Sequence, residues 1–164
     1  MTSWIALTRP VPSSINDCEL SHVPRKPIDV MLAASQHSAY EKALGRAGCE
    51  IHRVAADDAH RDSVFIEDTA VIFDELAVLT RPGASSRRAE IGSVAEVLAK
   101  WRTLVRIQPP ATLDGGDVLV MGRAVYVGAS ARTDRAGIEQ LTGFLTPHGY
   151  SVRPVPGARC LHLK

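Results

Sequence analysis

The sequence predicts a mixed α+β fold, an α/β propeller whose blades have the order strand, strand, helix, strand. Two observations predict this class. Apolar segments with the two-residue period of strands alternate with segments of helical period along the 164 residues. A strand-strand-helix-strand pattern also occurs twice, so that Asp68 and Asp117 open matching hairpins 49 positions apart. Because such a unit cannot bury both faces of its small sheet alone, we expect the copies to gather around an axis with their helices outside.

The first part of the chain predicts a strand, a long loop, a helix and a second strand. Trp4–Leu7 has strand alternation, and the prolines and polar residues in segment 10–17 predict an irregular loop. The apolar spacing from Asp29 to Ala47 is helical, with Asp29 as the N-cap residue. Cys49–Val54 is the second predicted strand.

Each copy of the repeated pattern begins with a hairpin. In the first copy the hairpin strands are Thr69–Phe73 and Leu76–Thr80, followed by a helix from about Ser86 to Trp101 and a strand at Leu104–Ile107. The second copy has strands at Val118–Met121 and Ala124–Val127, a helix from about Thr133 to His148 and a strand at Ser151–Val155.

Composition limits the function classes. Nineteen basic and 18 acidic residues give a formal charge of +1, so the chain lacks the basic field of a general nucleic-acid binder. Apolar segments are too short to span a membrane and the N-terminus does not resemble a signal peptide, which predicts a cytoplasmic protein without membrane contact. Cys18, Cys49 and Cys160 are an odd number without C-x-x-C spacing, which argues against a disulfide framework or a zinc site.

Both repeats place a carboxylate at the start of a strand and an arginine before the helix. In a ring of such units the loops at one end of the inner strands converge, so these polar groups are expected to form a pocket. Carboxylates and guanidinium groups together suit a zwitterionic substrate that also carries a cation, best an amino acid with a guanidinium group. The candidate residues are Asp62, Glu67, Asp68, Asp114, Asp117, Arg87 and Arg132.

Six segments in one order carry a resemblance that covers the whole chain. These segments are Ser35–Tyr40, Asp62–Thr69, Thr80–Glu90, Thr112–Val118, Val127–Thr133 and Leu161–Lys164. On them the sequence resembles the dimethylarginine dimethylaminohydrolase (dimethylargininase) family of the guanidine-modifying superfamily, which also includes arginine deiminase. The resemblance implies a five-bladed propeller, of which this chain would supply about three blades and one further strand.

The resemblance also implies an activity. It is the hydrolysis of asymmetric Nω-methylated arginines to citrulline and an alkylamine such as dimethylamine, by covalent thiol catalysis and without a cofactor or metal. His162 is the implied general acid and base, with Asp114 beside it. Asp62 would hold the α-ammonium group of the substrate, and Arg87 and Arg132 would hold its carboxylate. Glu67 and Asp68 would hold the substrate guanidinium, and Leu20 would lie in a lid loop.

The nucleophilic cysteine of the family lies downstream of the His-Leu-Lys motif, beyond Lys164. We therefore expect residues 1–164 to be a single catalytic-type domain that is incomplete at its C-terminus and inactive alone. Its expected partners are a methylated arginine and either a C-terminal fragment or a second copy of the chain. Cys160, two residues before His162, is a less favoured substitute for the thiol.

Other interpretations stay open at this point. The chain could belong to an arginine deiminase-like amidinohydrolase, or bind an arginine derivative without turnover. The Gly-Gly pair between Asp114 and Asp117 could be a turn that uses positive φ, with no ligand. The loop that contains Asp57, Asp58, His60 and Asp62 could bind a hard cation, although it lacks EF-hand spacing and a solvated acidic loop is favoured.

Overall fold

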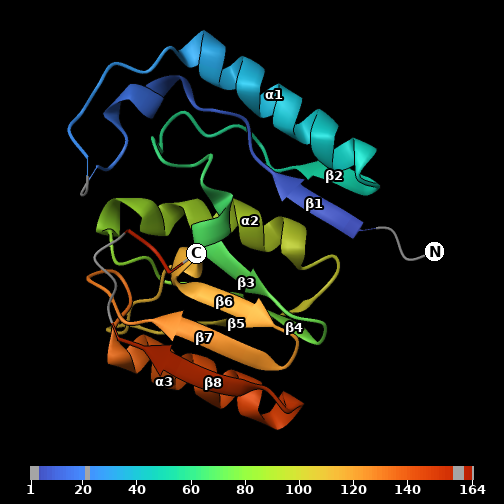
Figure 1. Cartoon of the computed structure of the whole chain (residues 1–164), viewed down its shortest axis with the longest axis vertical. Coiled ribbons are helices and arrows are strands. Elements are labelled where there is room, and N and C mark those ends of the chain that lie inside the picture. The colour runs from blue at the N-terminus through green and yellow to red at the C-terminus, as the bar shows by residue number, and fades with distance from the viewer. Residues whose placement is uncertain (1–3, 21–22, 157–160, 164) are drawn as a thin grey trace. The chain divides into compact units, whose positions relative to one another are not determined.

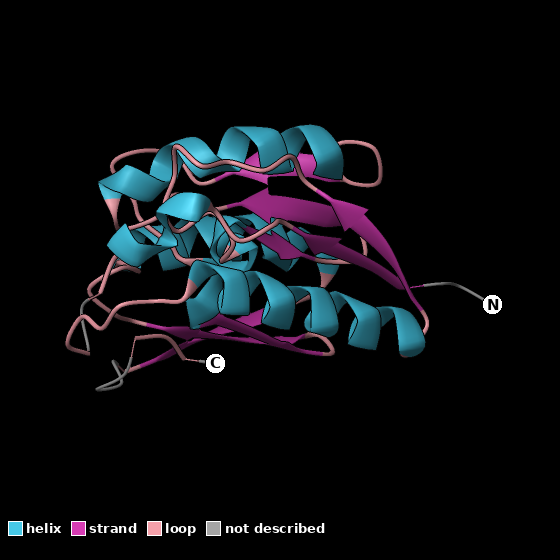
Figure 2. Ribbon diagram, turned by 90° about the horizontal axis from the view of Figure 1, so that it is seen from above, coloured by secondary structure: helices cyan, strands magenta, loops and turns pink. Residues whose placement is uncertain are grey.

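The computed structural model describes residues 4–20, 23–156 and 161–163. This part of the chain contains both helices and strands (Figure 2), and the strands form three small sheets with the orders β1-β2, β3-β4-β5 and β6-β7-β8 (Figure 1). The mixed α+β class is thereby confirmed. The chain divides into two compact units, residues 1–66 and 67–164. No helix of the described residues is both long and apolar enough to cross a bilayer.

In the first unit a helix connects two parallel strands. β1 (Trp4–Thr8) pairs with β2 (Cys49–Arg53). The connecting helix α1 (Val30–Arg46) begins where predicted, because the Asp29 carboxylate accepts a hydrogen bond of 3.0 Å from the Leu32 N–H. Gly48, at φ +93°, ends the turn that follows the helix.

Segment 10–17 is more regular than predicted. Ser13–Asp17 form a 3₁₀ helix, η1, where the sequence predicted an irregular loop. Ile15 is buried, and its backbone closes both a bond to Pro12 and one from Cys18. The Asn16 amide also bonds Ile28 in both directions, at 2.6 and 2.9 Å, which fixes the segment. Burial of one apolar side chain and a side-chain clamp therefore override the irregular composition.

The second unit contains two copies of one topology. β3 (Ala70–Ile72) and β4 (Leu76–Leu79) are antiparallel, and β4 is parallel to β5 (Thr103–Arg106), with α2 (Ile91–Leu98) between them. β6 (Val118–Met121), β7 (Ala124–Gly128), α3 (Arg135–Leu145) and β8 (Ser151–Val155) repeat this order and these pairings. The predicted internal repeat is confirmed.

The helix of the first repeat begins five residues later than predicted. Residues Ser85–Glu90 form a 3₁₀ helix, η3, before α2 starts at Ile91. Arg87 and Glu90 in this segment are buried and pair with each other, so the tight turn brings two long polar side chains inward. In the second repeat the Asp134 carboxylate caps α3 by accepting the Gly137 N–H at 2.7 Å.

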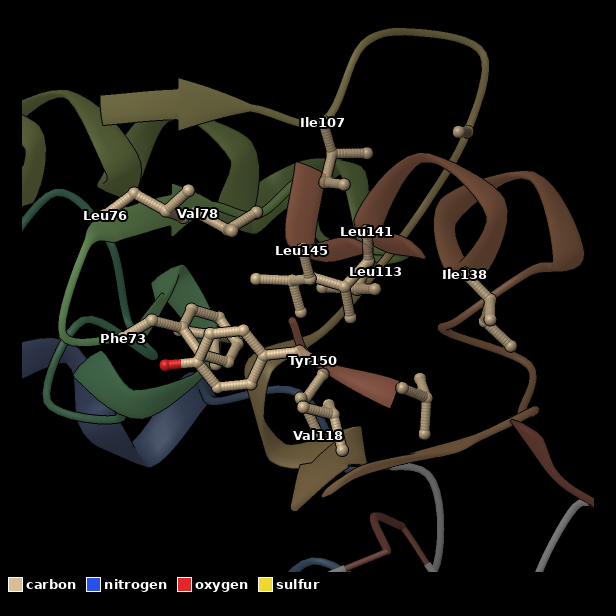
Figure 3. Close-up of a cluster of buried hydrophobic side chains, with 14 residues drawn as sticks. Phe73, Leu76, Val78, Ile107, Leu113, Val118, Ile138, Leu141, Leu145 and Tyr150 are labelled. Carbon is tan, nitrogen blue, oxygen red and sulfur yellow. The ribbon is translucent and has the colours of Figure 1, made fainter. Parts of the chain in front are cut away.

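One hydrophobic core serves both repeats (Figure 3). Leu141 and Leu145 of α3 are fully buried against Leu113, and α3 packs on β8. The Phe73 and Tyr150 rings meet edge to face with centroids 5.0 Å apart. Each such buried side chain contributes about 1.5–3 kcal/mol. The loops that carry the polar residues therefore extend from a well-packed hydrophobic core.

Candidate functional site

His162 is surrounded by three aspartates of the second unit. Its Nε2 atom lies 3.4 Å from Asp68 Oδ1, and its Nδ1 atom lies 3.7 Å from Asp117 Oδ1. Asp114 offers a third carboxylate, and one ligand atom each of Asp68, Asp114 and His162 lie within 4.8 Å of one another. Asp68 belongs to η2 (Ile66–Thr69), and Asp117 closes η4 (Gly115–Asp117). The convergence of acids predicted for the two repeats is therefore present, with a histidine at its centre.

Asp68 is held by its own hydrogen-bond partners. Its Oδ1 atom accepts the Gly116 N–H at 3.0 Å, and its Oδ2 atom accepts from Arg87 Nη1 at 2.5 Å. The Thr80 hydroxyl donates to the Asp68 main-chain carbonyl at 2.6 Å. The side chain is only 8% exposed, so the Asp68 carboxyl group is held in place with one oxygen directed at His162.

Arg87 is tied to two carboxylates. Glu90 accepts a forked pair of bonds from it, at 3.2 Å from Nε and 3.0 Å from Nη2, while Asp68 takes the bond from Nη1. Burial opposes the charge of Arg87, but the bonds and charges of Glu90 and Asp68 outweigh burial and raise the pKa of Arg87 above its ordinary value. The guanidinium is therefore a permanent charge that is embedded in the protein.

Asp114 is fully buried and is less well neutralised. Gly83 N–H donates to its Oδ1 at 2.9 Å, and Arg132 Nη1 lies 3.6 Å from its Oδ2. Burial raises the pKa of Asp114, against the lowering effect of the Gly83 N–H and the Arg132 charge. Asp114 Oδ2 accepts no hydrogen bond within the described residues, so it is a buried acceptor available to a donor group of a ligand.

Asp117 is the opposite case, because hydroxyl donors satisfy one of its oxygens. Its Oδ2 atom accepts from Thr133 Oγ1 at 2.6 Å and from Ser130 Oγ at 2.7 Å. Burial alone would raise the pKa of Asp117, but His162 and these two hydroxyls lower it. Asp117 is thus a stable anion whose second oxygen faces His162.

The environment of His162 favours its protonated form. Asp117 is the main cause of a raised His162 pKa, burial opposes it, and the charges of Asp68 and Asp114 add to the increase. The side chain remains 15% exposed, so a ligand can still reach the ring. The ring therefore keeps its second proton to a higher pH than a free histidine does, and in that form it is a proton donor.

Gly115 and Gly116 allow the His162 ring to pack closely because they have no side chain. One interpretation of the sequence instead related this glycine pair to positive φ. Neither Gly115 nor Gly116 has positive φ. A Cβ at Gly116 would lie 2.7 Å from His162 Cγ and 2.8 Å from Asp68 Oδ1, and one at Gly115 would lie 2.1 Å from the Glu67 carbonyl oxygen. The interpretation of this pair as a positive-φ turn is therefore wrong, and the pair is instead the surface on which the imidazole rests.

The other predicted residues belong to three different segments of the chain. Asp62 and Leu20 belong to the first unit, where both Asp62 oxygens are 3.1 Å from the Glu19 N–H and Leu20 is 39% exposed. Glu67 lies in η2 beside Asp68 with an exposed side chain. Cys160 lies outside the described residues.

The carboxylates of the acidic loop in the first unit form hydrogen bonds with other groups of that unit. Asp57 bonds the His60 ring at 2.8 Å, Asp58 accepts the Ser13 N–H at 2.6 Å, and Asp62 accepts from Glu19. The spacing of Asp68, Asp114 and His162 in the second unit is tight enough for a cation, but Arg87 and Arg132 already pair with both carboxylates. We assign no metal to either group.

Sequence reasoning gave no role to Glu90, Ser130 and Thr133. All three stand in segments that carry the family resemblance, at Thr80–Glu90 and Val127–Thr133, so the segments could have directed attention to them. Their contacts could not have been foreseen, because Ser130 and Thr133 reach Asp117 across 13 and 16 positions.

The fold of this chain occurs in more distant solved structures. The N-terminal domain of ArgZ, a cyanobacterial arginine dihydrolase whose structure was determined with bound substrate, matches 92% of this chain with a TM-score of 0.77 at 17% identity; the match covers 56% of that domain chain. At this identity the match shows a common fold.

A family model described as N,N dimethylarginine dimethylhydrolase, eukaryotic, matches residues 13–158. The chain belongs to the dimethylarginine dimethylaminohydrolase family, as the sequence resemblance indicated. N(G),N(G)-dimethylarginine dimethylaminohydrolase of Streptomyces coelicolor is 44% identical over the whole chain, which spans 64% of that relative. The Pseudomonas aeruginosa family member, solved as a cysteine-to-serine mutant with citrulline, matches 99% of this chain and 64% of its own, with TM-score 0.94 and 33% identity.

Proposed function

We propose that this chain supplies the substrate-binding and acid-base residues of an enzyme that hydrolyses asymmetric Nω-methylated arginines to citrulline and an alkylamine. The observation that carries the proposal is the group of buried aspartates around His162 in a chain of this family. Because the chain spans 64% of its relatives' length, we propose that the nucleophilic thiol comes from a segment corresponding to the remainder. The three sheets would then be blades of a five-bladed propeller, organised as one domain.

The geometry supports distinct parts for the polar groups. A guanidinium is planar and carries only donors, so it needs acceptors at its edge. Asp68 Oδ1 would be such an acceptor beside His162, and Asp114 keeps the catalytic place beside His162 that the resemblance implies. Glu67 is assigned to the same guanidinium by its place next to Asp68, and Asp62 and Leu20 keep the roles that the resemblance implies as predictions.

The two arginines support the substrate carboxylate unequally. Arg132 makes one ion pair of 3.6 Å with Asp114 and is 15% exposed in its side chain, so it retains donors for a second anion. Arg87 already donates to Glu90 and Asp68. We propose that Arg132 makes the principal contact with the carboxylate and that Arg87 contributes mainly its charge.

The chemistry then follows from the protonated state of His162. A thiolate attacks the guanidinium carbon, the bond from carbon to the methylated nitrogen breaks, and the amine leaves with the proton of the imidazolium. The neutral imidazole next takes a proton from water, which attacks the thiouronium carbon and releases citrulline. The thiolate is restored and the imidazole is again protonated. The second proton of the water is lost when the hydroxyl becomes the ureido carbonyl, and it leaves the released amine protonated in solution.

An experiment with the intact chain separates this proposal from its alternatives. Mass-verified chain is assayed for citrulline from asymmetric dimethylarginine, alone and with a polypeptide that corresponds to the remaining C-terminal part of the Streptomyces coelicolor relative. We expect no turnover alone and turnover in the mixture, with Cys160→Ser as active as wild type. Turnover by the chain alone that Cys160→Ser abolishes would instead make Cys160 the nucleophile.

The same assay addresses the two other candidate functions. Faster turnover of arginine than of dimethylarginine would favour a deiminase-like enzyme. Citrulline binding by calorimetry without turnover in any mixture would favour a binding protein. The carboxylate contact is tested with agmatine, which has no carboxylate and should bind equally to wild type and Arg132→Ala.

A further inference from the structure

We infer that Glu90 is a positioning residue that makes the site select a cationic side chain: it shares the Arg87 guanidinium with Asp68, so that the three groups together keep one negative charge for the ligand. The inference rests on the proposed function, in which Asp68 accepts the substrate guanidinium. Neither the family resemblance nor the proposed mechanism gives Glu90 a role. The geometry of these three buried side chains supplies one.

Glu90 fixes the orientation of the Arg87 guanidinium. Its Oε1 atom accepts from Arg87 Nε at 3.2 Å, and its Oε2 atom accepts from Nη2 at 3.0 Å. A guanidinium is planar, so a fork that holds Nε and Nη2 also fixes the direction of Nη1. Nη1 donates to Asp68 Oδ2 at 2.5 Å. One arginine therefore connects two carboxylates through different nitrogens.

The local backbone brings Arg87 and Glu90 together. They are three positions apart in the 3₁₀ helix η3, where side chains three residues apart lie one above the other. α2 starts at the next residue, Ile91, which is 3% exposed, and Val94 in the same helix is 1% exposed. The buried contacts of α2 therefore anchor the end of η3 and keep the Glu90 carboxylate in place.

The charges of this group do not cancel. Two carboxylates and one guanidinium leave one formal negative charge. The side chains of Glu90, Arg87 and Asp68 are 1%, 4% and 8% exposed, so solvent screens that charge weakly. A cation of the ligand would balance the charge, whereas a neutral group would not. Without the charge of Glu90, Arg87 would balance Asp68 and the advantage of a cationic ligand would be lost.

The other charged groups near Asp68 do not remove this imbalance. Asp114 lies 3.6 Å from Arg132 Nη1, and Asp117 lies 3.7 Å from His162 Nδ1, so each of these acids has one basic partner. Asp68 faces the same imidazole at Nε2, 3.4 Å away. Among the described residues four buried acids therefore share three basic groups, and the negative charge that Glu90 adds is not cancelled.

This charge distinguishes the substrate from the product. Asymmetric dimethylarginine carries a guanidinium cation, whereas citrulline carries a neutral ureido group in the same place. The two molecules share the α-ammonium and carboxylate groups. Glu90 therefore strengthens binding of the substrate without strengthening binding of the product.

The test compares the two ligands on the full 164-residue chain. Calorimetry measures the affinities of asymmetric dimethylarginine and citrulline, since we expect no turnover by the chain alone. Glu90→Gln should reduce the ratio of the two affinities by about tenfold, because it removes a poorly screened charge and keeps the size of the side chain. Glu90→Asp keeps the charge and should keep the ratio within about threefold of wild type.

Glu139→Gln is the matched control. Glu139 also pairs with an arginine, Arg135, at 2.7 Å, but the two side chains on α3 are 62% and 92% exposed. This variant should leave the ratio unchanged. An equal loss of both affinities in Glu90→Gln would make Glu90 a merely structural residue, and an unchanged ratio would give its charge no part in selection. Either result would overturn the inference.

NMR of the wild type tests the positioning even if Glu90→Gln does not fold. In a chain with ¹⁵N-labelled arginine, a forked guanidinium gives separate Nη1 and Nη2 signals and an Nε proton that exchanges slowly with water. We expect this signature for Arg87 and not for the exposed Arg135. A single averaged Nη signal for Arg87 would overturn the inference. A wild type that binds neither ligand would count against the proposed function, and the Arg87 signals would then decide the positioning.

Turnover adds a kinetic measurement. In the mixture that forms citrulline, Glu90→Gln should raise KM for dimethylarginine by about tenfold and change kcat by less than about threefold, because the lost charge acts on the bound cation before and during the reaction. A lower kcat with an unchanged KM would contradict a role in selection.

Discussion

The two repeats of the second unit have one topology but use their arginines differently. Arg87 and Arg132 both stand between the hairpin and the helix of their repeats. The Arg87 side chain is 4% exposed and bonds Glu90 and Asp68, whereas the Arg132 side chain is 15% exposed and has one ion pair of 3.6 Å. The same position in a fold can therefore hold a structural charge in one copy and a charge open to a ligand in the other.

The matching aspartates differ in the same manner. Asp68 accepts a backbone N–H and a guanidinium, while Asp117 accepts two hydroxyls. Hydroxyl partners leave Asp117 with its full charge, and the arginine partner of Asp68 offsets its charge. His162 lies between the two, so the ring has an unequal environment on its two nitrogens.

Arg87→Ala should give the largest loss of stability. The variant leaves Glu90 and Asp68 buried without their cation, which costs about 3–5 kcal/mol. Urea unfolding followed by circular dichroism measures the loss. Arg132→Ala is the matched variant, and it should cost less than Arg87→Ala, because it removes one ion pair of 3.6 Å and leaves one buried carboxylate, Asp114, without its cation in place of two. Equal losses from both would break the comparison.

Arg132→Ala should instead give the larger loss of ligand affinity. Removing its charge should weaken binding of an arginine derivative by about 2–4 kcal/mol, if the carboxylate contact is buried. Calorimetry with citrulline, at a temperature where both proteins are folded, is the measurement. Arg135→Ala is the control, since that side chain is 92% exposed on α3 and pairs only with Glu139 among the described residues. An Arg132→Ala protein with unchanged affinity would refute the assignment.

The pH dependence of stability should show the smallest effect. The pKa of His162 is raised in the folded chain, so its stabilising contribution is complete below the ordinary histidine pKa and is lost as pH rises through the raised value. The free energy of unfolding should therefore fall over this range in wild type. His162→Gln should remove that fall, while His52→Gln, at an exposed pair with Glu50, should retain it. Parallel profiles for all three proteins would contradict the expected charge on His162.

Local signals explain most of what the sequence predicted. Asp29 is a helix start because a carboxylate two or three residues before free N–H groups caps them, and this needs no knowledge of the fold. Strand alternation predicted the hairpins, because it too is a local pattern that needs no knowledge of the fold. The late start of α2 was not visible, because the 3₁₀ segment depends on where Arg87 finds Glu90 and Asp68.

The site was predictable by residue type more than by partner. The sequence indicated that Asp68, Asp114 and Asp117 would converge with the two arginines, but it did not indicate that Arg87 pairs with Glu90 and Asp68. Which carboxylate faces which imidazole nitrogen depends on side-chain packing across tens of residues. The Ser130 and Thr133 hydroxyls that fix Asp117 have no composition signal of their own.

The close contacts of the glycines affect how mutational scans of this family should be interpreted. At Gly137 an added Cβ would lie 2.1 Å from the Thr112 carbonyl oxygen, and at Gly83 it would lie 2.5 Å from the Arg132 Cα. Both positions will therefore reject every substitution in a library selected only for folded protein. Depletion at these codons measures backbone proximity, whereas depletion at His162 that appears only under selection for turnover would report chemistry.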